Sequence, residues 1–319
     1  MRRYRDRMTR RIRFGHQAAL APGADPIDVA RRAEALGFDT FLVPDHVGPG
    51  RHAPLITLAA ASSGTEVIRL GTFVLNSDMR NPVQLAWVAI SLDHLSHGRF
   101  ELGLGAGHTP QEYAQTGIEM RPPADRKAAL AERVEVVRRL LDGESVTVDG
   151  IRHRLDAAVL DRSHQERLPI LVGGNGAALL GHAGVHADII GLQGLGRTQP
   201  DGHRHSVRWE VAHLDEQIEQ VCAGAGDRIS AIELNALVQI VDITDDAEHS
   251  LEAIAARNGG GLSAAVLAET PYALVGTVDE IADEILRARD RWGITYFAVR
   301  ALDEFGPVID RVRVLEAAS

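Results

Sequence analysis

Two side chains suited to proton chemistry stand next to each other at Asp45 and His46, directly after an apolar run over residues 38–43. A histidine titrates near neutral pH, so it can pass a proton or donate a hydrogen bond to a ring carbonyl. A surface turn in which Asp45 caps the next helix is the simpler alternative. We predict His46 as the first candidate proton donor, with His108 second and His16 third.

Small residues end another apolar run, where a flat ligand could approach the backbone closely. Gly105, Ala106 and Gly107 follow the run over residues 99–104, and such residues permit unusual backbone angles. Asn76 stands at the tip of a further apolar run and could hydrogen-bond the edge of a planar heterocycle. The glycine pattern alone is weak support for a dinucleotide site, because no helix follows it at once.

A second glycine-rich turn, Gly173-Gly174-Asn175, leads straight into a helical pattern. Free backbone N–H groups at a helix start attract phosphate, so the turn predicts phosphate binding. A tight turn that needs glycine for steric reasons is the alternative. His182 and His186, four residues apart, lie in or just after this helical pattern and offer too few metal ligands, so we expect no metal site.

The bulk properties exclude several classes of protein. The chain has 319 residues and a formal net charge of −10, and the charge argues against non-specific nucleic-acid binding. Cys222 is the single cysteine, which excludes an intrachain disulfide and a cysteine metal cluster. Apolar runs are too short to span a membrane. This balance is typical of a cytoplasmic enzyme that acts on a small molecule.

The elements that must position these residues alternate along the chain. Short apolar runs predict eight strands, at residues 12–20, 38–43, 67–75, 99–104, 168–172, 187–192, 231–241 and 294–299. Helical patterns stand at residues 25–36, 54–62, 82–95, 124–141, 175–183, 206–223, 246–257, 279–292 and 302–314. Near-continuous apolar strands separated by helices indicate a parallel α/β sheet, open or closed. Eight such units favour a closed (β/α)8 barrel, the TIM barrel, with insertions.

Some stretches interrupt this alternation. Residues 1–11 are basic and are predicted to be a disordered extension or to precede a later start codon, leaving a single domain over residues 12–319. Residues 144–153 predict a hairpin. The stretch 194–205 has no periodicity and is a candidate lid or pocket wall, with a disordered surface loop as the alternative. Residues 258–271 are predicted to be a loop.

Taken together and in order, several segments resemble the luciferase-like family of flavin- and deazaflavin-dependent oxidoreductases. The resemblance covers residues 12–314 and is most specific in the Ser-x-Asp-x-Leu-Ser-x-Gly-Arg pattern and the glycines that follow it. The segments that carry it are residues 37–46, 69–74, 91–107, 169–174 and 275–282.

The resemblance implies a (β/α)8 barrel with an insertion that binds coenzyme F420, or FMN, at the carboxyl ends of the strands. It also implies a non-prolyl cis peptide between Phe73 and Val74, whose bulge supports the back of the cofactor ring. By the same resemblance, the cofactor-binding residues are Asp45, His46, Phe73, Val74, Asn76, Gly105, Ala106, Gly107, Gly173, Gly174 and Asn175.

The chain also departs from the family pattern. Sugar-phosphate dehydrogenases of the family carry a glutamate at the end of strand four, where the corresponding stretch of this chain is Gly105-Ala106-Gly107-His108. They also carry a tryptophan shortly after the strand-two histidine, where residues 47–50 read Val-Gly-Pro-Gly. These differences argue against sugar-phosphate oxidation by that mechanism. The short 194–205 stretch differs from the long loop of luciferases, which argues against light emission.

Three functions remain open from the sequence. The compact insertion and the Pro-Asp-His sequence favour an F420-dependent oxidoreductase that moves a hydride to or from a C=C, C=N or carbonyl group. The alternative is a two-component FMN monooxygenase supplied by a partner flavin reductase. A non-catalytic cofactor-binding barrel is the third. The resemblance to the family also implies a homodimer. An F420-dependent oxidoreductase could be supplied by a partner F420 reductase.

Overall fold

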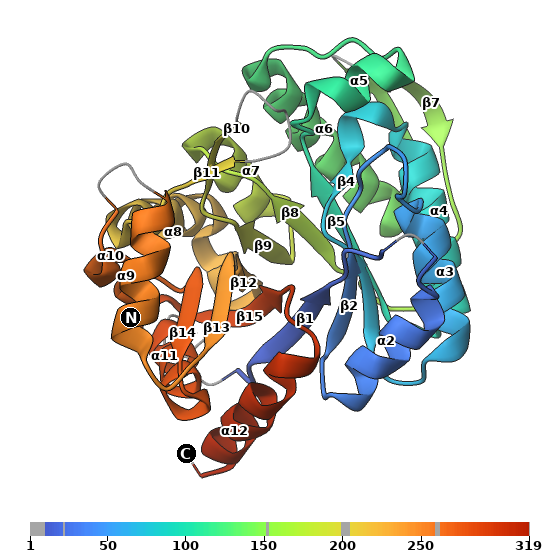
Figure 1. The fold of residues 1–319 in the computed structure, drawn as a ribbon. Coiled ribbons are helices and arrows are strands. Elements are labelled where there is room, and N and C mark those ends of the chain that lie inside the picture. The colour runs from blue at the N-terminus through green and yellow to red at the C-terminus, as the bar shows by residue number, and fades with distance from the viewer. Residues whose placement is uncertain (1–9, 22, 151–152, 199–204, 259–261, 319) are drawn as a thin grey trace.

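The computed structural model describes residues 10–21, 23–150, 153–198, 205–258 and 262–318. The parallel sheet is a closed barrel with eight strand positions around its circumference (Figure 1). It is closed because β3 pairs with β5 at Leu70 and Phe100, and β1 pairs with β15. The third position is split into two segments, β3 and β4. The barrel strands are β1 (Arg13–Gln17), β2 (Thr40–Val43), β3 (Arg69–Thr72), β4 (Leu75–Asn76), β5 (Phe100–Gly105), β8 (Ile170–Gly173), β9 (Ile189–Leu192), β12 (Glu233–Leu237) and β15 (Ile294–Val299). The predicted fold class is confirmed.

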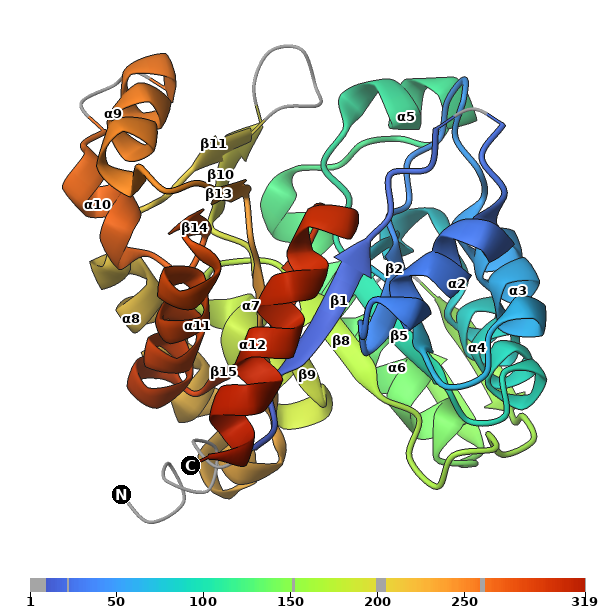
Figure 2. The same ribbon diagram turned by 60° about the horizontal axis from the view of Figure 1, so that its bottom comes forward.

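Helices surround the barrel on the outside (Figures 1 and 2). They are α2 (Pro26–Ala35), α3 (Pro54–Gly64), α4 (Pro82–Leu95), α5 (Pro110–Thr116), α6 (Pro123–Leu141), α7 (Ala177–His186), α8 (Val211–Ala225), α9 (Ala247–Asn258), α10 (Ala264–Glu269), α11 (Val278–Trp292) and α12 (Gly306–Ala317). Their ends follow local capping rules. In α11, for example, Thr277 and Glu280 form a capping box and Gly293 ends the helix with φ +67°.

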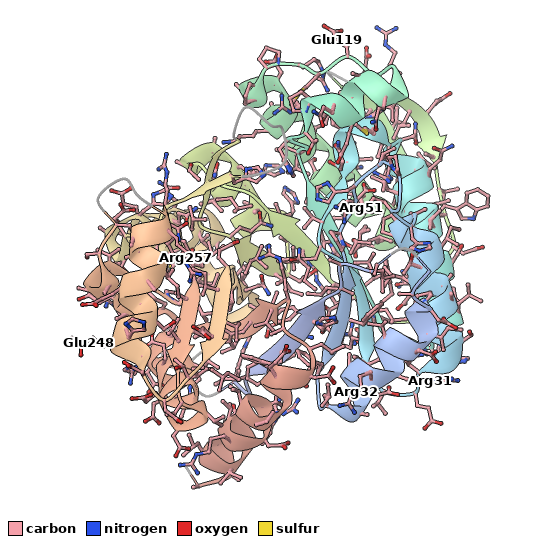
Figure 3. All side chains as sticks on the ribbon, viewed as in Figure 1. Arg31, Arg32, Arg51, Glu119, Glu248 and Arg257 are labelled. Carbon is pink, nitrogen blue, oxygen red and sulfur yellow. The ribbon has the colours of Figure 1, made fainter. Side chains whose placement is uncertain are left out.

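Most side chains of the barrel strands are apolar because both faces of the sheet are buried. One hydrophobic cluster fills the layer between strands and helices and includes Phe14 and Phe305. A smaller cluster, with Phe73 and Tyr296 among its members, fills the barrel interior. Charged side chains such as Glu119 instead lie at the periphery (Figure 3).

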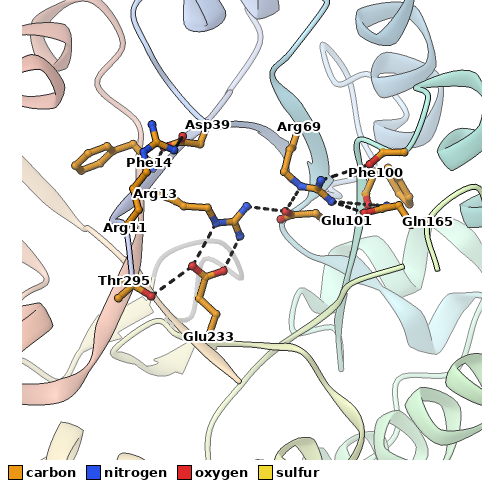
Figure 4. Close-up of polar contacts among 11 residues, drawn as sticks. Arg11, Arg13, Phe14, Asp39, Arg69, Phe100, Glu101, Gln165, Glu233 and Thr295 are labelled. Atoms are coloured by element: carbon orange, nitrogen blue, oxygen red, sulfur yellow. Dashed lines mark hydrogen bonds and ion pairs between the residues drawn. The ribbon is translucent and has the colours of Figure 1, made fainter. Parts of the chain in front are cut away.

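An ion network closes the amino-terminal end of the barrel (Figure 4). Arg13 lies 2.8 Å from Glu101 and 2.7 Å from Glu233, and Arg69 lies 2.5 Å from Glu101. Glu101 is 3% exposed. Burial alone would raise the pKa of Glu101, but Arg13 and Arg69 outweigh it and lower that pKa. Each charge in the network is therefore compensated at the end of the barrel opposite the predicted site.

Several elements differ from the sequence prediction. The run over residues 231–241 divides into β12, inside the barrel, and the start of β13 (Ile240–Ile243), which pairs with β14 (Ala273–Gly276) outside it. The helices α5 and α10 were not predicted, and α10 lies in the stretch predicted to be a loop. The helix predicted from residue 206 begins at Val211.

Two hairpins account for the other irregular stretches. The predicted hairpin is formed by β6 (Val146–Asp149) and β7 (Arg154–Ala158). The ends of the 194–205 stretch form a second hairpin from β10 (Leu195–Thr198) and β11 (His205–Val207), and residues 199–204 lie outside the described part. Figure 2 shows this hairpin and α5 above the carboxyl ends of the barrel strands.

The amino-terminal extension lies mostly outside the described residues, which begin at Arg10. Arg11 forms an ion pair with Asp39 at 2.7 Å, so the folded part includes the end of that stretch. Within the described residues, no helix combines the length and the apolar character needed to cross a membrane.

Candidate active site

A cavity of about 390 Å³ opens at the carboxyl ends of the strands. Barrel strands, the loops after them and the β10–β11 hairpin all contribute to its wall. It is lined by Gln17, Pro44, Asp45, His46, Phe73, Val74, Leu75, Asn76, Gly107, His108, Glu112, Gln193, Leu195, His205, Val207, Leu237, Gln239 and Arg300. The candidate pocket wall predicted at residues 194–205 is thus represented in the cavity by Leu195 and His205.

A histidine–carboxylate pair lies in this cavity. His46 Nδ1 is 2.7 Å from Oε1 of Glu112, whose side chain is 5% exposed, whereas that of His46 is 34% exposed. Glu112 lies on α5, a short helix that begins at Pro110 just beyond β5. If Nδ1 donates to this carboxylate, Nε2 of His46 is left to exchange a proton with a ligand. The pair has the geometry of a histidine oriented by a buried acid.

Asp45 has a different environment from its neighbour His46. Its carboxylate binds Arg80 at 2.5 and 3.0 Å and accepts a hydrogen bond from the backbone N–H of Asn76 at 2.8 Å. The side chain is therefore engaged on two sides although Asp45 lines the cavity. This arrangement ties the loop after β2 to the end of β4, and it makes Asp45 a positioning group.

Asn76 presents an amide to the same cavity. Its Oδ1 accepts a hydrogen bond from the backbone N–H of Asp78 at 3.2 Å, which fixes the orientation of the amide. Its Nδ2 is buried and has no hydrogen-bond partner among the described residues. A buried donor without a partner is costly, so a ligand acceptor at this position would complete it.

The floor of the cavity depends on glycines that pack against Val74. The Phe73–Val74 peptide is cis, as predicted. A Cβ atom at Gly105 would lie 2.5 Å from Val74 Cγ2, and one at Gly173 would lie 3.1 Å from Val74 Cγ1. Gly107 has φ +70°, and its Cβ would clash with Asn76 Oδ1. These positions therefore admit only glycine without rearrangement of the cavity.

A second cavity, of about 710 Å³, shares Val74, Gly107, His108 and other wall residues with the first. It continues toward the start of α7 and is lined there by Gly105, Ala106, Gly173, Gly174 and Asn175. The two cavities together hold all the residues predicted to bind a cofactor or exchange a proton at this site, except His16.

The far end of the second cavity is cationic. Lys127 and Arg126, both on α6, line it. Lys127 Nζ donates to Asn175 Oδ1 at 3.1 Å and has no ion-pair partner among the described residues. Burial, and then the charge of Arg126, lower the pKa of Lys127. An uncompensated cation of this kind is suited to an anionic ligand.

The start of α7 adds backbone donors to this cationic end. The residue before the helix is Gly176, with φ +96°, and no side chain caps the first turn. Asn175 Nδ2 instead donates to the carbonyl of Leu195 at 2.7 Å, which anchors β10. The first turn of α7 therefore has no side-chain cap, as in many phosphate sites, and Gly174 and Asn175 just before it line the same cavity as Lys127.

The other predicted proton donors have different positions. His108 lies between two histidines, with ring centroids 5.7 Å from His46 and 4.5 Å from His205. His16 does not line either cavity, which contradicts its selection as third candidate. Its ring contacts Phe38 on the outer side of β1, and burial lowers its pKa to about 4. Successive side chains of a strand point to opposite faces, so Gln17 faces the cavity whereas His16, the residue before it, does not.

Glu112 and Lys127 were not singled out from the sequence. Glu112 follows His108 by four residues, but nothing in the sequence predicted the short helix that turns it toward His46. Lys127 belongs to a charged helix, and its place beside Asn175 depends on the packing of α6 against α7.

With this geometry established, comparison with known proteins gives the family. The family model described as luciferase-like monooxygenase matches residues 9–296. The chain belongs to the luciferase-like monooxygenase family. The resemblance seen in the sequence is confirmed.

Curated relatives of this luciferase-like chain include F420-dependent glucose-6-phosphate dehydrogenases. That of Intrasporangium calvum is 37% identical over 182 residues, which are 54% of each protein. That of Beutenbergia cavernae is 29% identical over 298 residues, which are 88% of this chain and 83% of the relative. For the Intrasporangium calvum enzyme and two other curated F420-dependent glucose-6-phosphate dehydrogenases, the chain spans about half of the relative's length.

A solved structure shares the fold of this family member over nearly its whole length. It is an F420-dependent secondary alcohol dehydrogenase in complex with an F420–acetone adduct, with a TM-score of 0.73 and 23% sequence identity. The match covers 94% of this chain and 97% of that one.

Proposed function

We propose that this protein is an F420-dependent oxidoreductase that transfers a hydride between the deazaflavin and a small organic substrate. The observation that carries the proposal is a pair of joined cavities with different chemistry. One contains the His46–Glu112 pair, and the other ends at Lys127 and the uncapped start of α7. The names of the curated relatives support the choice of F420 over other flavins.

The residues present fit such a coenzyme. The unpartnered Nδ2 of Asn76 would donate to an acceptor on the edge of the ring. Val74, with the glycines packed behind it, would support the ring face, and Gly107 permits close approach. Gly173, Gly174 and the first turn of α7 would hold the phosphate, with Lys127 compensating its charge. When bound, the deazaflavin supplies or accepts the hydride.

The chain itself supplies the proton that accompanies hydride transfer. His46 would donate it from Nε2 to the substrate, or remove it in the opposite direction. Glu112 accepts from Nδ1 and thereby fixes the tautomer and the orientation of the ring. His108 lies next to His46 and is the second candidate.

The substrate differs from a sugar phosphate in this proposal. The stretch Gly105–His108, which corresponds to the position of a glutamate in the sugar-phosphate dehydrogenases of the family, contains no acidic residue here. Three glutamines, Gln17, Gln193 and Gln239, make part of the wall polar but uncharged. We infer a small carbonyl, C=N or activated C=C compound, or the corresponding alcohol, oriented by amide hydrogen bonds.

The remaining expectations are proposals on the same basis. We propose that residues 12–319 fold as one domain, that the protein works in the cytoplasm as a homodimer, and that a separate F420 reductase renews the coenzyme where the reaction consumes its reduced form.

The experiment that tests the function is a comparison of coenzyme binding. Oxidised and reduced F420 and FMN are titrated with the protein by calorimetry and by the fluorescence of the coenzyme. Tryptophan fluorescence is less suitable, because no tryptophan is among the described residues that line the two cavities. Micromolar binding of F420 with weak binding of FMN is expected.

Other outcomes would redirect the proposal. Preference for reduced FMN would support a two-component monooxygenase with a partner reductase. Binding of F420 without turnover on a panel of carbonyl, imine, enone and alcohol compounds would favour a non-catalytic cofactor-binding barrel. Binding of neither coenzyme would refute the proposed function and leave the fold and family.

A further inference from the structure

The two histidines for which the sequence offered too few further ligands to predict a metal site lie beside a glutamate on the outer helices of the barrel. His182 and His186 lie four residues apart on α7, and Glu135 lies on α6, which packs against α7. One potential ligand atom from each residue lies within 4.8 Å of the other two. None of the three lines either of the joined cavities. The cluster is therefore separate from the proposed coenzyme site.

One of the two histidines has a ring nitrogen held by the backbone. His182 Nε2 lies 2.8 Å from the carbonyl oxygen of Ala131. A carbonyl only accepts, so Nε2 carries the proton and Nδ1 keeps its lone pair. Histidine ligands commonly have their other ring nitrogen fixed in this way. The rings of His182 and His186 have centroids 4.6 Å apart and planes 36° from parallel.

We propose that Glu135, His182 and His186 bind a divalent transition-metal ion of the Zn²⁺ type. Two imidazoles and one carboxylate form a ligand set that suits such ions and leaves at least one position for water. Bonds of about 2.0–2.2 Å in a tetrahedral site would place the ligand atoms roughly 3.3–3.6 Å apart. All three side chains are accessible to solvent, so modest rotations can close the present separation.

Neighbouring positive charges work against the ion. Arg138 and Arg228 lie close enough to His186 to influence it electrostatically. Arg138, however, forms an ion pair with Asp188 at 2.5 Å, and Arg228 donates to the carbonyl of Gly184 at 2.8 Å. The residual repulsion favours ions that bind imidazole strongly, and it disfavours Mg²⁺ and Ca²⁺.

The position of the cluster suggests what the ion does. It would join α6, which carries Lys127, to α7, whose first turn begins the proposed phosphate site. An ion bound to the folded chain stabilises it by mass action. We therefore expect Zn²⁺ to raise the melting temperature, whether or not a coenzyme is present.

The test uses the full untagged chain after treatment with a chelator. Zn²⁺ is titrated by calorimetry, Co²⁺ by its visible absorption, and melting is followed with and without Zn²⁺. We expect one tight equivalent of Zn²⁺, a tetrahedral Co²⁺ spectrum and an upward melting shift. Glu135→Gln and His186→Asn should each weaken binding by at least the 10- to 100-fold typical of a lost outer-shell partner.

The matched control is His249→Asn, which changes an exposed histidine on α9 and should leave Zn²⁺ binding unchanged. His164→Asn tests a second histidine group, because the His164 ring lies 6.0 Å from that of His94. The proposal is overturned if Zn²⁺ does not bind, or if binding and the melting shift survive both cluster variants. Loss of binding only in His164→Asn would also overturn it. Equal melting temperatures without metal show that the cluster variants fold.

Discussion

The pairing of His46 with Glu112 yields the most specific prediction for the proposed chemistry. The change is Glu112→Gln, which keeps the size of the side chain and its place on α5 but removes the negative charge. If Glu112 fixes the orientation and tautomer of His46 through its contact with Nδ1, proton transfer from Nε2 slows in the variant. Coenzyme binding should be nearly unchanged, because Glu112 does not line the second cavity, where Lys127 and the glycine turn are proposed to hold the phosphate.

The size of the effect follows from the contact. The Nδ1 to Oε1 distance of 2.7 Å is that of a hydrogen bond to a charged group, and the carboxylate is almost fully buried. Such bonds contribute about 1.5–3 kcal/mol. At about 1.36 kcal/mol for each factor of ten, kcat should fall roughly 10- to 150-fold. The partial exposure of His46 favours the lower part of this range.

The assay measures kcat and KM separately for the best acceptor from a carbonyl and enone panel, with reduced F420 as donor. A double-mutant cycle adds His46→Gln and the double variant. If Glu112 acts through His46, the double variant should be no slower than His46→Gln alone. Additive losses, or a loss confined to coenzyme affinity and melting temperature, would refute this account of Glu112.

Three further predictions concern the other parts of the molecule. Glu101→Gln should lower the free energy of unfolding by about 3–5 kcal/mol at neutral pH. Because the folded-state pKa of Glu101 is depressed, the gap from wild type should shrink as pH falls through that pKa, and a constant gap in denaturant titrations would contradict this. Lys127→Met should weaken F420 binding roughly 10- to 150-fold in calorimetry, without a comparable loss of melting temperature. Gly107→Ala should abolish coenzyme binding because its Cβ would meet Asn76 Oδ1, whereas Gly117→Ala, with nearly the same φ but open space, should retain it; equal losses would refute the steric argument.

The barrel could be predicted because its strands carry their own signal. Strands buried on both faces are short apolar runs, and seven of the eight predicted strands coincide with single barrel positions. The exception at residues 231–241 is instructive. Leu237 belongs to the barrel interior and Ile240 to a separate pair with β14, yet both look alike in sequence. An apolar run cannot reveal which sheet its backbone joins.

The glycine turn at one end of the site could be predicted from the sequence, but the histidine–carboxylate pair at the other end could not. Glycine turns such as Gly173-Gly174 follow strands directly, so a barrel places them at the mouth by topology alone. Glu112, in contrast, reaches His46 across 66 residues of sequence through a helix of one and a half to two turns. His16 shows the opposite error, because a one-residue step along β1 moves a side chain from the cavity to the outer layer.

The arrangement of charge explains how an acidic chain can bind a phosphate-bearing coenzyme. The net charge of −10 would oppose an anion if it were spread evenly over the cavities. The two carboxylates near the proposed ring site are both engaged, Asp45 by Arg80 and Glu112 by His46. Lys127 at the other end has no carboxylate partner among the described residues. Arg300 in the first cavity also has no carboxylate partner among the described residues, so both cavities can attract an anionic ligand although the whole chain is acidic.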